Sequence, residues 1–248
     1  MSKRHEKLGI KQTIQKHWMD HVVKMMLAGL KEKEIRAELD EFLAKEKPYT
    51  GFVPQTHSFV KTNLASWFAP DKDVIPFRDH AFALIRHENP RNWLPYHWAV
   101  ISASYPFWFS VAKQTGRLFN LQSQIRQAQV FSRLKEQYGD RETVARNARY
   151  AIRSFVAWGV LEDSKVKGCY GQCKPMAISE PNLTTLLYEA ALYADKEGKA
   201  ALELLKNNPA FFPFQLPVLT GDYISQQSNA IDVIRYGLDD ELLKLKDK

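Results

Sequence analysis

The sequence contains few cysteines and glycines, and it lacks the glycine-rich motifs of common nucleotide-binding and hydrolytic enzymes. Only two of the 248 residues are cysteine and eleven are glycine. No G-x-x-x-x-G-K-[ST], G-x-G-x-x-G or G-x-S-x-G pattern occurs, so those phosphate-binding and nucleophile-presenting loops are excluded. The basic, polar residues 1–16 contain no apolar core of a secretory signal. Two cysteines cannot form a disulfide framework, so we expect a cytoplasmic protein.

Metal-binding and catalytic patterns are also scarce. Cys169 and Cys173 have no second pair of ligands that would complete a structural zinc site, so two free thiols in a loop are expected. His17 and His21 stand one helical turn apart, but the glutamate of the zinc-protease motif is absent, and packing or solvent-facing roles are favoured. The acidic clusters at 71–79 and 239–241 are interpreted as exposed caps or tail rather than as a nuclease site. We therefore predict no enzyme activity, no metal and no cofactor.

The longest uncharged stretch covers residues 94–112 and could be mistaken for a membrane span. It carries two prolines, a histidine and three serines, and the mean hydropathy of the chain is −0.39. A span needs roughly 20 predominantly apolar residues. Its aromatic residues include Trp98, Phe107 and Trp108, with no interleaved cation that base stacking on a single strand would use. We interpret the stretch as a buried aromatic core, with no contact to a membrane.

The spacing of apolar residues predicts a mainly α-helical protein with one small β-hairpin. Four segments are expected: an amino-terminal helical pair (1–47), a loop and aromatic-rich core helices (48–104), a central segment (105–180) and an acidic helical tail (181–248). Within them the predicted helices cover 11–29, 32–45, 77–87, 96–116, 122–137, 141–158, 182–194, 198–206 and 225–236. Residues 47–62 are predicted to be a loop or an extended connection.

Positive charge is concentrated in one part of the chain. The formal net charge is +7, and residues 112–158 hold nine basic against three acidic side chains. Residues 182–248 hold seven basic and ten acidic side chains, so the carboxyl-terminal quarter is acidic. Such asymmetry indicates a polyanion-facing module carried on a neutral or acidic scaffold.

The basic segment contains the most specific pattern of the chain. After the predicted helix at 122–137, a Tyr-Gly-Asp turn leads to the helix at 141–158, whose apolar side includes Val144, Ala148 and Phe155. The opposite side carries Arg146, Arg149 and Arg153. A strand is predicted at 160–163, a loop holding both cysteines at 164–173, and a returning strand at 174–178.

This order of helix, tight turn, basic helix, glycine and β-hairpin resembles the winged helix-turn-helix family. The resemblance covers about residues 105–180 and rests on the stretches 139–144 (Gly-Asp-Arg-Glu-Thr-Val) and 158–162 (Trp-Gly-Val-Leu-Glu). It implies that the second helix lies in the major groove of DNA and that the hairpin, the wing, touches the backbone or the minor groove.

Carried onto this sequence, the resemblance assigns contacts by position. Arg146, Arg149 and Arg153 would face the groove, while Arg141 and Thr143 at the helix start would hold a phosphate. Asn147 and Tyr150 flank the same face, and asparagine can read adenine as arginine reads guanine. The remaining expected contacts, from the wing and the preceding helix, are Lys165, Lys167, Arg126 and Arg133.

The function expected from these features is non-catalytic binding of double-stranded DNA. The chain would act as a transcriptional regulator or as an adaptor subunit of a DNA-processing system, such as a bacterial defence complex. The alternative is an interaction scaffold whose winged helix docks a protein without nucleic acid, and an arginine face that is merely solvated would fit that alternative. RNA binding shares the electrostatics, although an A-form major groove would not admit the helix. Residues 209–217, from Pro209 to Pro217, either pack back onto the domain or, like the acidic tail, offer a surface to a protein partner.

Overall fold

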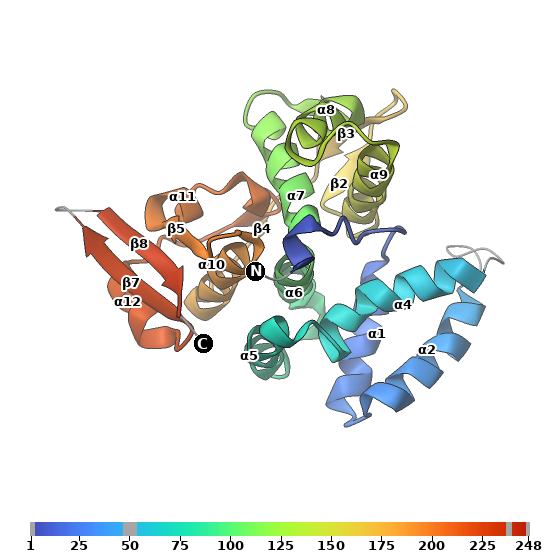
Figure 1. The fold of residues 1–248 in the computed structure, drawn as a ribbon, viewed down its shortest axis with the longest axis horizontal. Coiled ribbons are helices and arrows are strands. Elements are labelled where there is room, and N and C mark those ends of the chain that lie inside the picture. Colours follow the sequence, from blue (N-terminus) through green and yellow to red (C-terminus); the bar gives the residue numbers. More distant parts are fainter. Residues whose placement is uncertain (1–2, 47–53, 237–239, 247–248) are drawn as a thin grey trace.

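The protein is mainly helical, and in the described part of the chain three small sheets join its helices. The computed structural model describes residues 3–46, 54–236 and 240–246. Helix α6 (Leu94–Ser104) lies at the centre of Figure 1, with the amino-terminal helices below and to the right, α7 to α9 above, and the carboxyl-terminal elements to the left. Among the described residues no helix is long and apolar enough to cross a membrane. The uncharged stretch is divided at Tyr105, where α6 ends and α7 (Pro106–Phe119) begins.

The amino-terminal part consists of helices packed around buried aromatic and aliphatic side chains. A short 3-10 turn, η1 (Lys3–Glu6), precedes α1 (Lys16–Leu27) and α2 (Glu32–Lys45), which confirms both predicted helices, the first in shortened form. The prediction of a connection up to residue 62 is wrong, because α4 spans Pro54–Phe68. Val60, Leu64 and Trp67 recur at helical spacing and are fully buried, and this pattern extends past the end of the predicted loop. Residues 47–53 of that prediction lie outside the described residues.

Short elements connect this part to the aromatic core. The 3-10 turn η2 (Lys72–Val74) leads into α5 (Ile75–Ile85), close to the predicted helix, and η3 (Pro90–Asn92) precedes α6. In the core, Trp98 of α6 lies 5.6 Å from Trp108 of α7, measured between ring centroids, and 5.0 Å from Phe155. The same four-ring cluster includes Trp158, 5.0 Å from Trp108. Tilted and edge-to-face rings of this kind stabilise a core beyond the area they bury.

Residues 106–172 form a unit of three helices and a three-stranded sheet. Its elements are α7, β1 (Gln124–Arg126), α8 (Gln127–Tyr138), α9 (Glu142–Ala157), β2 (Leu161–Asp163) and β3 (Cys169–Gln172). Both strand pairs are antiparallel and the order in the sheet is β1-β3-β2. Two consecutive helices, α8 and α9, and a following antiparallel pair of strands are therefore present, and Gly159, with φ +73°, ends α9.

Two predicted boundaries in this unit are wrong. The helix predicted from 122 begins at Gln127, because residues 124–126 extend as β1 against β3, which buries Ile125. The returning strand of the hairpin is 169–172 rather than 174–178, because Gly168, with φ +77°, ends the connecting loop after five residues. Cys169 therefore lies buried within β3, and neither it nor Cys173 belongs to the loop. Residues 176–177 form β4 (Met176–Ala177), which pairs in parallel with β6 (Phe214–Gln215).

The carboxyl-terminal quarter is not the helical tail that the sequence predicts. Helix α10 (Pro181–Ala194) is as expected, but β5 (Lys199–Ala201) precedes α11 (Leu202–Lys206). After η4 (Pro209–Phe211) and β6, α12 (Gly221–Gln227) is followed by β7 (Ile231–Tyr236) and β8 (Asp240–Leu245). Cross-strand pairs of Ile231 with Leu245 and of Val233 with Leu243 provide the packing that overrides the predicted helix.

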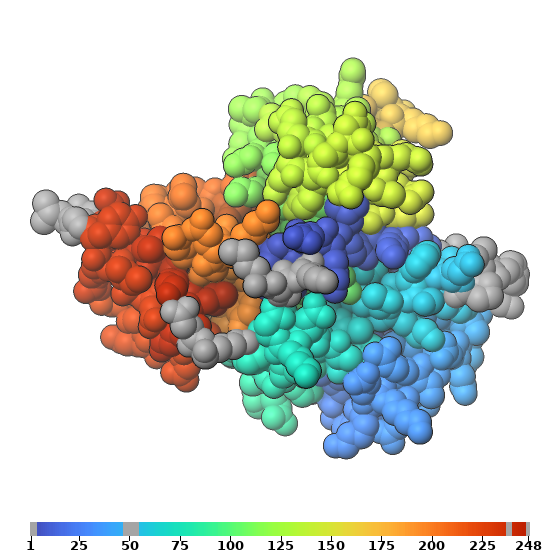
Figure 2. Space-filling view, in the orientation of Figure 1, coloured from blue at the N-terminus to red at the C-terminus, as the bar shows by residue number. Residues whose placement is uncertain are grey.

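The same element order occurs twice in the chain. In residues 181–245 the order is helix, strand, helix, helix and two strands, with η4 and β6 inserted before α12. The strand order β5-β8-β7 again places the last strand between the other two, as in β1-β3-β2. Figure 2 shows the two units as separate bulges of the surface, one at the top and one on the left. We call residues 106–172 the basic unit and residues 181–246 the acidic unit.

The proline- and phenylalanine-rich stretch at 209–217 packs back onto the molecule. Phe211 and Phe214 are buried, and Phe212 lies 5.8 Å from Trp98 between ring centroids. Gly116 of α7 permits this packing, because a Cβ there would overlap the carbonyl oxygen of Pro209. The stretch therefore closes one side of the aromatic core.

Candidate nucleic-acid interface

Helix α9 has one buried and one exposed side, as its periodicity predicts. The four residues Val144, Ala148, Ala151 and Phe155 are fully buried. On the opposite side Arg146 and Arg149 are exposed and Arg153 is half-buried. A helix anchored by one face against the core holds the cations of its other face in a fixed array.

Each of the three arginines also has a contact within the protein. Arg153 Nη1 lies 2.5 Å from Asp163 Oδ1, which ties α9 to β2. The Arg149 guanidinium lies over the ring of Phe131 in α8, 5.8 Å from its centroid. Arg146 Nη1 lies 3.8 Å from Glu142 Oε1, one turn earlier on the helix. Of the three, Arg153 is the most firmly held by a carboxylate.

The loop between β2 and β3 presents further positive charge. Lys165 and Lys167 are both exposed and flank Val166, which is 60% exposed. Within the described part of the chain, neither lysine pairs with an acidic side chain. Arg126 is exposed at the end of β1, where it pairs with Cys169 directly after this loop. Tertiary structure therefore brings Arg126 to the base of the hairpin.

The first turn of α9 has backbone N–H groups that no side chain caps. Arg141 is the N-cap residue and its side chain makes no capping hydrogen bond, although its Nη2 donates to the Tyr138 carbonyl at 3.0 Å. Thr143 is exposed in the first turn. Uncapped backbone N–H groups at a helix start attract anions. Arg133, half-buried on α8, lies two turns of helix beyond Arg126.

Asn147 and Tyr150 do not lie on the outer side of α9. Asn147 is only 6% exposed and Tyr150 is half-buried. Both line a cleft between α9, the amino-terminal segment and α4. Asn147 could therefore contact an adenine only if the base entered this cleft.

The amino-terminal segment is fastened to α9 by two buried hydrogen bonds. The Ile14 N–H donates to Ser154 Oγ at 2.8 Å, and Trp158 Nε1 donates to the Ile14 carbonyl at 2.9 Å. This attachment places Lys7 and Lys11 at the cleft, together with Arg36 from α2. The sequence assigned none of these three residues to the interface. Residues 1–47 hold eleven basic and eight acidic side chains, but nothing local indicates that they reach α9.

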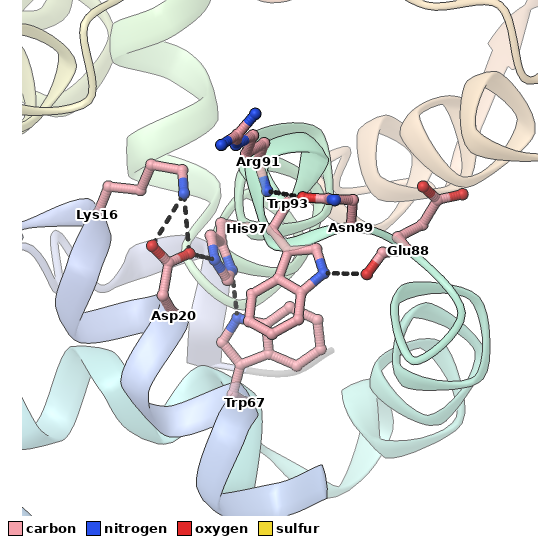
Figure 3. A network of polar contacts seen from close by, with 8 residues as sticks. All are labelled: Lys16, Asp20, Trp67, Glu88, Asn89, Arg91, Trp93 and His97. Atoms are coloured by element: carbon pink, nitrogen blue, oxygen red, sulfur yellow. Dashed lines mark hydrogen bonds and ion pairs between the residues drawn. The ribbon is translucent and has the colours of Figure 1, made fainter.

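A buried polar network elsewhere resembles a catalytic pair but is structural. In Figure 3, Asp20 of α1 and Trp67 of α4 lie on either side of His97 of α6. His97 Nε2 lies 2.8 Å from Asp20 Oδ1, and Trp67 Nε1 donates to His97 Nδ1 at 3.0 Å. Burial lowers the pKa of His97, and an Nδ1 that accepts from an indole N–H is unprotonated, so the ring is neutral. With both nitrogens engaged and no exposed surface, His97 has no reach to a substrate.

Other candidate metal ligands make packing or hydrogen-bonding contacts. His21 stacks on Phe42 with ring centroids 4.1 Å apart, and His17 Nε2 lies 2.7 Å from Glu46 Oε2. Among the described residues no group of three or more histidine, cysteine or acidic side chains is arranged to hold a metal ion.

A second cleft, of about 790 Å³, lies between the amino terminus, α5 and the acidic unit. Its walls carry both signs of charge, including Arg4, Asp73 and Lys244. Buried Glu189 lies 3.1 Å from Nδ1 of His80 within it. The cleft beside α9 differs, because the described residues that line it include five cations and one acidic residue.

Comparison with known proteins identifies no relative: no family model, no curated protein and no solved structure matches the chain.

Proposed function

We propose that the basic unit is a winged helix-turn-helix that binds double-stranded DNA without catalysing a reaction. The observation that carries the proposal is the exposed arginine side of α9 beside the lysine-bearing β2–β3 loop, both on one compact unit. The order of its elements and the buried inner face of α9 support it.

The dimensions of α9 suit a major groove. Sixteen residues make a helix of about 24 Å, enough to lie along a groove and to present several side chains to base edges. Arg146 and Arg149 would contact bases, while Arg141 and Thr143 would hold a phosphate at the helix start. Lys165 and Lys167 would contact the backbone from the hairpin.

The internal contacts of the arginines do not oppose this function. Exposed ion pairs contribute only about 0–1 kcal/mol, so exchanging a carboxylate for a phosphate costs little. Arg146 is the readiest to exchange, because its distance to Glu142 is 3.8 Å. Arg153, bonded to Asp163 at 2.5 Å, is better suited to holding the hairpin against α9.

The remainder of the chain favours a subunit over a minimal regulator. The acidic unit and the amino-terminal helices add mass that a small DNA-binding protein does not need. An adaptor or accessory subunit of a DNA-processing or defence system would use this mass to contact other proteins. We therefore include in the proposal that the acidic unit contacts a protein partner.

The test is a salt series of binding to a random-sequence DNA duplex. Three to five neutralised phosphates give a log–log slope of about −3 to −4.5. The Arg146→Glu/Arg149→Glu variant should lose most of this affinity, because two contacts become repulsive. Its matched control is Lys24→Glu/Lys33→Glu, which reverses two exposed charges on α1 and α2, away from the basic unit.

Two outcomes would contradict the proposal. A folded wild type that fails to bind duplex at low salt favours the scaffold alternative and a search for a protein partner. Equal or tighter binding to structured RNA would contradict major-groove docking, because the A-form groove does not admit a helix. Circular dichroism and thermal unfolding of each variant show whether lost binding reflects a lost fold.

A further inference from the structure

The cleft beside α9 has the size and composition of a ligand site. It measures about 1120 Å³ and lies between α9, the amino-terminal segment and α4. Small-molecule sites commonly occupy roughly 300–1,000 Å³, so this cleft is slightly larger than most and has room for a whole nucleotide. We call it the basic cleft, because its lining cations are Arg4, Lys7, Lys11, Arg36 and Arg146.

The positive charge of the basic cleft is only partly neutralised. Asp71 is the one acidic residue among the described residues that line it. Arg36 Nη2 lies 2.8 Å from Glu32, and Arg4 Nη2 lies 3.4 Å from Asp73.

Lys7 and Lys11 keep their charge available. In the described parts of the chain neither has an acidic partner. Two unpaired ammonium groups and Arg146, gathered around a concave surface, favour a multiply charged anion.

An aromatic side chain stands beside these cations. Phe59 of α4 lines the basic cleft with 38% of its surface exposed, although large apolar side chains usually bury more. Lys11 Nζ lies 5.3 Å from the centroid of its ring. Because Nζ lies over the ring, a base would stack on the part of the ring that the lysine leaves exposed, with its phosphate near the ammonium group.

Polar groups without partners also line the basic cleft. The hydroxyl oxygens of Ser66 and Ser104 are buried and, among the described residues, make no hydrogen bond. Ser66 is only 2% exposed as a residue. A buried hydroxyl normally has a hydrogen-bond partner, but a ligand could reach these two oxygens only if the wall of the cleft moved, because both are closed to solvent. The hydroxyl of Tyr105 already has a hydrogen-bond partner, because it donates to the Thr62 carbonyl at 2.7 Å.

We propose that the basic cleft binds a nucleotide, with its base against Phe59 and its phosphates on Lys7, Lys11 and Arg146. Thr143 and Asn147 of α9 line the same cleft, so the bound nucleotide would also contact the helix assigned to DNA. The proposal stands independently of DNA binding. If both hold, a nucleotide competes with DNA for Arg146.

Two sources can supply such a ligand. One is a free nucleotide, and the other is the terminal nucleotide of a single strand. The chemistry that the cleft recognises is the same, so both are titrated as separate arms of one experiment.

The experiment measures binding of ATP, inorganic triphosphate and 5′-phosphorylated tetrathymidylate by calorimetry at low salt. We expect ATP or the oligonucleotide to bind at least tenfold more tightly than triphosphate, because triphosphate lacks a base to stack. Tighter binding of ATP identifies a free nucleotide as the source, and tighter binding of the oligonucleotide identifies a strand terminus.

Two variants locate the binding. Lys7→Gln/Lys11→Gln should weaken all three probes by about tenfold or more, because each loses charge-assisted contacts. Phe59→Ala should weaken only the probes that carry a base. Lys24→Gln/Lys33→Gln is the matched control and should change nothing, since both lysines are exposed and neither lines the cleft.

The proposal is overturned if folded wild type binds none of the probes below millimolar concentration. It is also overturned if Lys7→Gln/Lys11→Gln, folded as judged by thermal unfolding, binds them as wild type does. Duplex binding measured on the same samples separates the two proposals, because it can persist when the nucleotide site fails. If Arg149→Glu abolishes duplex binding but leaves ATP binding unchanged, the nucleotide site does not depend on DNA binding.

Discussion

The basic and acidic units share an element order but differ in charge and in the length of one helix. The third helix of the basic unit, α9, has sixteen residues and exposes arginines. Its counterpart in the acidic unit, α12, has seven residues and carries Asp222 in its first turn. Arg235 of β7 is held there by Asp222 and by Glu241, the latter at 3.2 Å. The same order of elements therefore carries different charge in the two units.

Helix length separates the two units as clearly as charge does. At 1.5 Å per residue, α9 is about 24 Å long and α12 about 10 Å. Two turns of helix present fewer side chains along a DNA groove than the longer α9 does. If the proposal of DNA binding holds, α9 rather than α12 is the helix that would enter the groove.

The largest expected effect concerns the residue that joins the two units. Trp98 contacts Phe155 of the basic unit at 5.0 Å and Phe214, which precedes the acidic unit's α12, at 5.8 Å between ring centroids. Trp98→Ala should lower the free energy of unfolding by about 3–5 kcal/mol, because it leaves a cavity at the centre of the core. Denaturant unfolding measures this loss, and Leu121→Ala, at a residue 75% exposed, is the control. A loss below about 1 kcal/mol would mean that the two units are stabilised independently.

A smaller loss of stability is expected at the contact between α7 and η4. Gly116→Ala places a methyl group against the Pro209 backbone, which must move away. We expect a loss of about 1–3 kcal/mol in the free energy of unfolding, as for overpacking of a close contact. Gly29→Ala tests the different cost of a positive φ, because it has φ +84° and open space around it. Unchanged stability of Gly116→Ala would show that 209–217 can detach from α7 at no cost.

Removal of two lysines from the hairpin should change the salt dependence of duplex binding in the basic unit but not in the acidic unit. Lys165→Gln/Lys167→Gln in the basic unit should reduce the salt slope of duplex binding by about 2, because two phosphate contacts are lost. Lys244→Gln/Lys246→Gln, in β8 of the acidic unit and directly after it, should leave the slope unchanged. Equal effects of the two pairs would abolish the proposed division between the units.

The smallest expected effect is on how the free energy of unfolding depends on pH. It concerns the buried network of Asp20, Trp67 and His97, which lies outside both units. Burial lowers the pKa of His97, so the folded protein resists a proton that the unfolded chain accepts near pH 6.5. Stability is then fully present above about pH 6.5 and is lost as pH falls toward the lowered folded pKa. Burial also acts to raise the pKa of Asp20, but hydrogen bonds from His97 and Lys16 outweigh it and lower that pKa, so its contribution is lost only in stronger acid.

Unfolding of wild type and His97→Gln between pH 7.5 and 5.5 tests this assignment. Wild type should lose more stability over that range than the variant. His5 and His21, whose pKa values burial also lowers, remain in both proteins and cancel in the comparison. Identical pH slopes would mean that His97 does not titrate between the folded and unfolded states.

Periodicity alone predicted several helices well, and it failed where sheet pairing took over. Helix α2 matches its predicted bounds, and α9 differs from its prediction by one residue at each end. Both have strongly patterned faces of which one is buried. The strand at 231–236 was predicted as a helix, because short apolar runs do not reveal whether a partner strand such as β8 will cover them.

The candidate interface also has one part that the sequence predicted and another that it did not. The sequence by itself determined the basic outer side of α9, because a 3.6-residue repeat places Arg146 and Arg149 opposite the buried Val144 and Ala148. Only the tertiary structure decided that Lys7 and Lys11 meet this helix, through the hydrogen bonds that link Ile14 to Ser154 and Trp158. Contacts between residues about 140 positions apart depend on the packing of the whole core, and no local pattern encodes them.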